Sequence, residues 1–167
     1  MSQVQIREAR DFLDADSVRW CVDKKREFSE GDDVRISKGT QTILLVEDEQ
    51  MVRNLLREML ESCGYRVLAA EDGRDALSIC ESYQEPIHLL ITDVVMPGMG
   101  GRELADRLAA VRPEVRVLYM SGYTDNVIVH RGVLDERMNF IQKPFTLEML
   151  LPKVREILGE PGPEQGQ

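Results

Sequence analysis

Residues 87–101 have the sequence IHLLITDVVMPGMGG, in which an apolar run ends at Asp93 and is followed by a loop rich in Gly and Pro. A short, nearly unbroken apolar run is typical of a strand buried on both faces, as the strands of a parallel sheet are. The Gly and Pro residues mark the loop that follows. We therefore predict a buried strand over 87–92 that carries a carboxylate at its carboxyl end.

Similar apolar runs recur along the chain and alternate with helical patterns. Strands are predicted at 43–46, 65–70, 115–120 and 140–141, and apolar residues at helical spacing predict helices at 51–60, 76–80, 104–109, 127–134 and 147–158. Pro152 should kink the last helix or shift its start. Because parallel strands need crossover connections, the alternation predicts an α/β fold, a doubly wound five-stranded parallel sheet with helices on both faces.

The regular pattern occupies residues 41–159, which we assign to one domain. Residues 1–40 are rich in charge and weakly patterned, and we interpret them as an N-terminal extension or linker that is partly ordered at best. Residues 160–167 contain mainly Gly, Pro, Glu and Gln, so we expect a disordered tail there.

Composition narrows the class of function. The net charge of −9 repels nucleic-acid phosphate and anionic lipid, so we expect no direct contact with nucleic acid or membrane. The chain has neither an apolar run of about eighteen residues nor a secretion signal, which predicts a cytoplasmic protein. Its three cysteines, Cys21, Cys63 and Cys80, form no Cys-x-x-Cys pair, and we interpret them as reduced and structural.

Polar residues gather at the carboxyl ends of the predicted strands, where open parallel sheets form their sites. The first strand ends in Glu47 and Asp48, the third in Asp93, the fourth in Ser121 and the fifth in Lys143. Clustered carboxylates repel one another unless a cation lies between them, and hard oxygen ligands suit Mg²⁺. One carboxylate can then act as a nucleophile and form an aspartyl phosphate, while Lys143 and Ser121 hold the phosphoryl oxygens.

Each of these residues also has a simpler structural interpretation. Asp48 alone could cap the following helix, Ser121 before a glycine could belong to a turn, and Lys143 could be a surface ammonium. Asp93 is harder to explain in this way, because it directly follows a buried strand. Four such residues at one edge of the sheet favour a functional site.

The chain resembles the receiver domains of response regulators in two-component signalling. The matching stretches are ILLVEDE at 43–49, LLITDVVMPGMGG at 89–101, LYMSGYTD at 118–125 and FIQKPF at 140–145. They follow one another in the order and spacing of the family. The segments SGYTDN at 121–126 and GVLDERMNFIQKPF at 132–145 are most similar to the C-terminal receivers of hybrid sensor histidine kinases.

The resemblance implies a flavodoxin-like sheet with strand order 2-1-3-4-5. It makes Asp93 the phosphoacceptor, and it implies that Mg²⁺ is held by Asp48, Asp93 and the carbonyl of Val95, with Glu47 acting mostly through water. Ser121 and Lys143 would bind the phosphoryl group, and Ser121 and Phe140 would be the switch positions. The bond between Lys143 and Pro144 is expected to be cis.

The resemblance also implies partners and a mode of action. The phosphodonor would be a phosphohistidine of a sensor histidine kinase or of a histidine phosphotransfer protein, and the output would pass to an unidentified downstream protein. A homodimer through the last helices is a further expectation. Because the phosphoryl group is taken up stoichiometrically, we do not expect the domain to be an enzyme.

Three positions depart from the usual pattern of the family. Position 140 is Phe, which has no hydroxyl to bond toward Ser121. Neither Val95 nor Tyr123 offers a carboxylate or amide to orient a hydrolytic water, which predicts slow loss of the phosphoryl group from Asp93.

Two other functions fit these residues less well. A phosphatase with an aspartyl-phosphate intermediate would need an acid where Val95 stands, and an inert interaction module would not need the complete acidic cluster.

Overall fold

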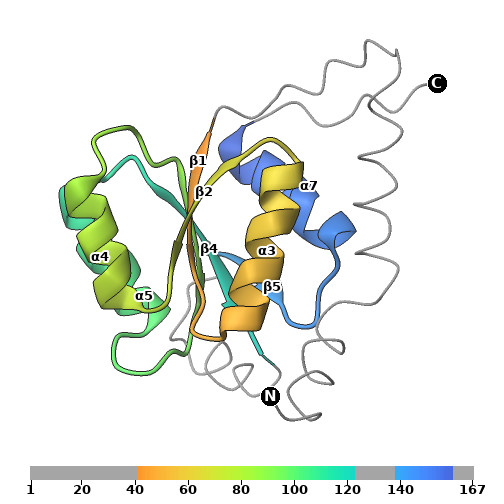
Figure 1. Ribbon diagram of the computed structural model, residues 1–167, viewed down its shortest axis with the longest axis horizontal. Coiled ribbons are helices and arrows are strands. Elements are labelled where there is room, and N and C mark those ends of the chain that lie inside the picture. Colours follow the sequence, from red (N-terminus) through yellow and green to blue (C-terminus); the bar gives the residue numbers. More distant parts are fainter. Residues whose placement is uncertain (1–40, 123–137, 160–167) are drawn as a thin grey trace.

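The computed structural model of the chain describes residues 41–122 and 138–159 (Figure 1). In chain order these residues form β1 (Thr42–Val46), α3 (Gln50–Ser62), β2 (Arg66–Ala70), α4 (Gly73–Ser82), β3 (Leu89–Asp93), α5 (Gly101–Val111), β4 (Arg116–Ser121), β5 (Asn139–Gln142) and α7 (Leu147–Leu158). Strands and helices alternate from β1 to β4, as the sequence predicts. Among the helices of these residues, none combines the length and apolarity needed to cross a bilayer.

The five strands form one parallel sheet in the order β2-β1-β3-β4-β5. This order confirms the predicted doubly wound topology. It reverses direction between β1 and β3, the point at which ligand sites form in sheets of this kind. The register aligns Val46 of β1 with Thr92 of β3 and Asp93 of β3 with Met120 of β4. The carboxyl ends of the three central strands therefore lie side by side.

Helices cover both faces of the sheet, and alternate residues of the central strands serve each face. Figure 1 shows α4 and α5 on one side of the sheet and α3 and α7 on the other. Ile43 and Leu45 of β1 belong to the core beneath α3 and α7, whereas Leu44 and Val46 belong to the core beneath α4 and α5. All four are fully buried, which explains why the run is continuously apolar.

Helix ends follow the local sequence. Asp72 caps α4, and its side chain accepts hydrogen bonds from the backbone N–H groups of Arg74 and Asp75, both at 2.8 Å. Gly159 ends α7 in the left-handed conformation, which glycine adopts without steric cost. Pro152 lies inside α7, which still begins at Leu147, as its apolar spacing predicts.

Some boundaries differ from the predictions. We predicted a strand over 87–92, but β3 begins at Leu89 and includes Asp93. His88 instead makes the backbone link that precedes the ladder, donating its N–H to the carbonyl of Thr42 at 2.9 Å. The predicted helix at 127–134, Tyr123, Cys21, the extension at 1–40 and the tail at 160–167 lie outside the described residues. Within them, Cys80 is a buried thiol that forms no disulfide.

Candidate functional site

Three carboxylates meet at the carboxyl edge of the sheet. Glu47 and Asp48 follow β1, Asp93 ends β3, and each offers an oxygen that lies within 4.8 Å of the others. Glu47 is only 2% exposed, Asp93 is half-buried, and Asp48 is exposed. Neighbouring parallel strands with this register bring the three groups together, as predicted. The exposed Asp48 leaves the cluster open to solvent on one side.

Lys143 lies among these carboxylates. Its Nζ donates a hydrogen bond to Glu47 Oε2 at 2.8 Å and another to the Asp93 carboxylate at 2.8 Å. The side chain is 18% exposed, so the interpretation of Lys143 as a surface ammonium is wrong. The peptide bond between Lys143 and Pro144 is cis, as the family resemblance implies. One ammonium faces three carboxylates, so the site carries excess negative charge.

The excess charge and burial perturb the protonation of Asp93. Burial, and then the charge of Glu47, raise the pKa of Asp93 to about 7, although Lys143 acts in the opposite direction. Burial lowers the pKa of Lys143, but the charges of Asp93 and Glu47 outweigh it and the net shift is upward. A second cation beside Asp93 would therefore be stabilised by the cluster.

The residues present fit a divalent metal ion. Mg²⁺ prefers hard oxygen ligands and usually binds through one or two carboxylates together with water. The exposed carboxylate of Asp48 and the partly buried carboxylate of Asp93 provide such ligands, while Glu47 is already bonded to Lys143 and accepts from the N–H of Glu49 at 3.2 Å. Because these bonds hold its carboxylate, Glu47 is placed to orient the metal ligands or their water rather than to bind the metal directly.

Asp48 does not cap the helix that follows it. The N-cap of α3 is Glu49, and no side-chain hydrogen bond caps this helix. The capping interpretation of Asp48 is therefore wrong. Ser121 is the last residue of β4 and is 1% exposed, so it is a strand residue and not part of an exposed turn. Its carbonyl accepts from the N–H of Lys143 at 2.7 Å, which places the two residues beside each other.

The two remaining predicted site residues, Val95 and Phe140, are both exposed to solvent. Val95 lies two residues beyond Asp93 and its side chain is 55% exposed. Phe140 is on the edge strand β5 and is 40% exposed. The roles of the Val95 carbonyl as a ligand and of Phe140 as a switch remain predictions.

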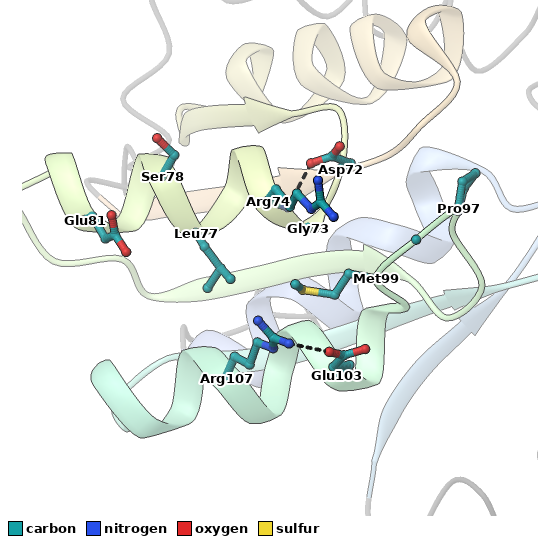
Figure 2. Close-up of a pocket in the computed structure, with 11 residues that line it drawn as sticks. Asp72, Gly73, Arg74, Leu77, Ser78, Glu81, Pro97, Met99, Glu103 and Arg107 are labelled. Atoms are coloured by element: carbon teal, nitrogen blue, oxygen red, sulfur yellow. Dashed lines mark hydrogen bonds and ion pairs between the residues drawn. The ribbon is translucent and has the colours of Figure 1, made fainter.

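The loop after Asp93 packs tightly between the sheet and the helices. A Cβ atom at Gly101 would lie 2.0 Å from the carbonyl oxygen of Asp93, so only glycine fits at the start of α5. Further along the loop, Met99 packs against Gly73 of α4. Figure 2 shows Met99 and Pro97 at one end of a groove of about 700 Å³ between α4 and α5. The groove is separate from the acidic cluster, but its end is formed by the loop that begins at Asp93.

Sequence reasoning missed Arg53. This residue of α3 donates from Nη1 to the carbonyl oxygens of Glu47 at 2.6 Å and of Asp48 at 3.2 Å. It lies in the first turn of the helix that follows the acidic pair, and this closeness in sequence is the signal that could have identified it.

The family model for the response regulator receiver domain matches residues 43–155. The chain belongs to this family. The match contains the acidic cluster, Ser121 and Lys143, and the family is that of two-component systems. The resemblance stated from the motifs is thereby confirmed, together with the flavodoxin-like fold.

Similar proteins include receivers of hybrid kinases. The sensor kinase CckA of Brucella abortus is 37% identical over 120 residues, which cover 72% of this chain and 13% of the kinase. The solved receiver domain of the hybrid histidine kinase CckA is 32% identical, with a TM-score of 0.59 over 70% of this chain and 98% of that one. The response regulator TrrA of Thermotoga maritima, solved in complex with Mg²⁺ and BeF, is 28% identical. Its TM-score is 0.58, and the match covers 70% of this chain and 98% of that one.

Several curated relatives are longer than the region they share with this chain. The chain spans 13% of the CckA kinase and between 31% and 53% of several others. The similarity therefore concerns the receiver domain and not the activities of the other domains of those proteins.

Proposed function

We propose that this receiver domain accepts a phosphoryl group on Asp93, in the presence of Mg²⁺, from a phosphohistidine of a sensor histidine kinase or of a histidine phosphotransfer protein. One observation carries the proposal. The Asp93 carboxylate ends β3 inside a cluster with two other carboxylates and contacts the ammonium of Lys143 at 2.8 Å. A carboxylate with an adjacent cation and oxygen ligands for a metal has the parts that phosphoryl transfer needs.

In the proposed reaction a carboxylate oxygen of Asp93 attacks phosphorus. The bond between phosphorus and the histidine nitrogen breaks as the bond to the Asp93 oxygen forms, and the imidazole leaves with its electron pair. Lys143 attracts the phosphoryl oxygens by charge, and the Ser121 hydroxyl donates a hydrogen bond to one of them. Bound Mg²⁺, held by Asp48, Asp93 and the carbonyl of Val95, would neutralise negative charge on the phosphoryl group.

The signal would leave the domain through protein partners. We propose that the phosphoryl group draws Ser121 toward it and that Phe140 turns inward, which alters the surface made by β5 and α7. Phe140 is 40% exposed on β5, so the proposed change would bury a ring that is partly in solvent. Each molecule takes up one phosphoryl group, so we propose a stoichiometric acceptor rather than an enzyme. A homodimer through the last helices is one way in which this surface could be used.

The test is covalent labelling by a small phosphodonor. The protein is incubated with acetyl phosphate or phosphoramidate and Mg²⁺, and intact mass is followed. We expect a gain of one phosphoryl group in wild type, no gain in Asp93→Asn, and a full gain in Asp106→Asn, which removes an exposed carboxylate of α5 outside the cluster. Labelling that persists in Asp93→Asn, or no labelling of folded wild type, would contradict the proposal.

The lifetime of the labelled form tests the absence of enzymatic turnover. Val95 offers no group to orient an attacking water, so we expect the phosphoryl group to be lost slowly, over minutes or longer. Release of acetate from acetyl phosphate should therefore stop near one equivalent in a short assay, with little inorganic phosphate formed. Sustained release of inorganic phosphate from acetyl phosphate would indicate a hydrolase instead.

A further inference from the structure

Arg53 ties the acidic loop to helix α3. Its guanidinium donates from Nη1 to the carbonyl oxygens of Glu47 and Asp48, at 2.6 Å and 3.2 Å. Its own backbone N–H donates to the carbonyl of Glu49 at 2.9 Å, which places Arg53 in the first turn of the helix. One side chain thus spans from the helix to both residues of the acidic pair.

The other hydrogen bonds of this loop act on Glu47 more than on Asp48. The backbone N–H of Glu47 donates to the carbonyl of Ala70 at 3.3 Å, and its carboxylate contacts Lys143. Asp48 and Glu49 are both exposed, and α3 begins without a side-chain cap. Asp48 is therefore not fixed by burial, and the hydrogen bond from Arg53 to its carbonyl helps to hold its main chain in place.

We infer that Arg53 is a positioning residue for the divalent cation, because it holds the main chain on either side of the Asp48 α-carbon in the orientation that turns the carboxylate toward Asp93. This inference rests on the proposed function, since it concerns the same metal site. Groups that orient metal ligands without touching the metal change its affinity by about 10–100-fold when removed. Arg53 acts through backbone carbonyls at a partly exposed position, so the lower end of this range, about tenfold, is expected.

The sign of the effect separates positioning from charge. Arg53 is a cation beside an acidic cluster, so removal of its charge alone would strengthen the binding of Mg²⁺. Removal of its hydrogen bonds would weaken binding, because Asp48 must then be ordered when the metal binds. The two explanations predict opposite changes in the dissociation constant.

The experiment measures Mg²⁺ binding by calorimetry in wild type, Arg53→Met, Arg53→Lys and Arg57→Met. Arg57 lies one turn further along the same helix and is partly buried like Arg53, so its variant is matched for charge and helix. We expect the dissociation constant to rise about tenfold in Arg53→Met and to stay the same or fall slightly in Arg57→Met. Arg53→Lys keeps the charge, but its side chain is shorter and its ammonium does not reproduce the position of Nη1, which donates to both carbonyls, so its constant should also rise.

A double-mutant cycle tests whether the effect passes through Asp48. In the Asp48→Asn background, where the ligand is already lost, Arg53→Met should change the weakened affinity by less than twofold. Circular dichroism and thermal unfolding check that each variant is folded. A dissociation constant in folded Arg53→Met that is unchanged or lower than in wild type would overturn the inference and leave the proposed function intact. Failure of wild type to bind Mg²⁺ would overturn both.

Discussion

The two edges of the sheet use polar side chains in opposite ways. At the amino edge, Thr42 donates its N–H to His88 Nδ1 at 3.0 Å, and Arg66 bonds to both Tyr83 and Glu85. Arg66 and Glu85 carry opposite charges and form an ion pair. At the carboxyl edge, three carboxylates share the ammonium of Lys143.

The difference indicates that polar residues at the amino edge of the sheet stabilise the fold, whereas those at the carboxyl edge serve its function. Paired polar groups stabilise a fold modestly, whereas uncompensated charge costs stability and is kept where it binds or reacts with something else. If this contrast is correct, changes at the amino edge should alter stability without altering Mg²⁺ affinity. Changes at the carboxyl edge should alter both, and in some cases in opposite directions.

The largest effect is expected for Lys143→Met. Loss of the ammonium leaves Glu47, which is 2% exposed, without its cationic partner, and breaking a buried pair in this way costs about 3 kcal/mol. The same change removes a cation that competes for the carboxylates, so Mg²⁺ should bind about tenfold more tightly. Denaturant unfolding with and without Mg²⁺, together with calorimetry, measures both effects. A variant that loses stability and Mg²⁺ affinity together would contradict the contrast.

Arg112→Met should destabilise the opposite edge without affecting the metal. The guanidinium donates to the carbonyls of Glu85 at 3.1 Å, of Cys80 at 3.0 Å and of Tyr83. It therefore closes the end of α4, and its loss leaves partly buried carbonyls unpaired, at a cost of about 2 kcal/mol. The free energy of unfolding should fall by this amount while the Mg²⁺ dissociation constant stays within twofold of wild type. Arg107→Met is the control, because its exposed ion pair with Glu103 contributes little.

Asp93→Asn should stabilise the protein when Mg²⁺ is absent. The pKa of Asp93 is raised from 3.8 to about 7 in the fold, first by burial and then by Glu47. The folded protein therefore holds a proton that the unfolded chain releases, so the wild type loses stability as pH rises from about 4 through about 7. At pH 8 the variant should be more stable by about 1–2 kcal/mol, and the gain should vanish near pH 4.

Urea unfolding in chelator across this pH range measures the difference between the two proteins. Addition of Mg²⁺ should narrow it at pH 8, because the ion binds and stabilises the wild type. A difference that is independent of pH would show that the charge of Asp93 is not the cause.

Sequence reasoning succeeded where a pattern has one physical solution. The apolar runs of β1 and β3 supply residues to both cores, so their burial on two faces could be predicted from composition alone. The register of parallel strands then brings Glu47, Asp48 and Asp93 to one edge. These parts of the fold and site follow from short-range rules that hold for any parallel sheet.

The contacts that depend on side-chain conformation could not be predicted in this way. Arg53 shares its helix with a second arginine, Arg57, and only the turn geometry shows that its guanidinium reaches the carbonyls of the acidic pair. Lys143 was predicted to bind a phosphoryl group, but its double contact with Glu47 and Asp93 depends on the path of the chain after β5. The start of β3 was misplaced because His88 bonds to Thr42 ahead of the ladder.

The smallest effect is expected for His88. Its Nδ1 accepts the backbone N–H of Thr42, a residue that is 3% exposed, so His88→Ala should leave this donor unpaired and cost about 1 kcal/mol. His88→Asn offers a side-chain oxygen at a similar distance from the backbone and should recover part of the loss. Neither variant should change Mg²⁺ affinity or labelling of Asp93, because His88 precedes β3 at the end opposite to the cluster. A loss of Mg²⁺ affinity in His88→Ala that His88→Asn restores would show that the two edges are coupled through β3 and that their division of roles is incomplete.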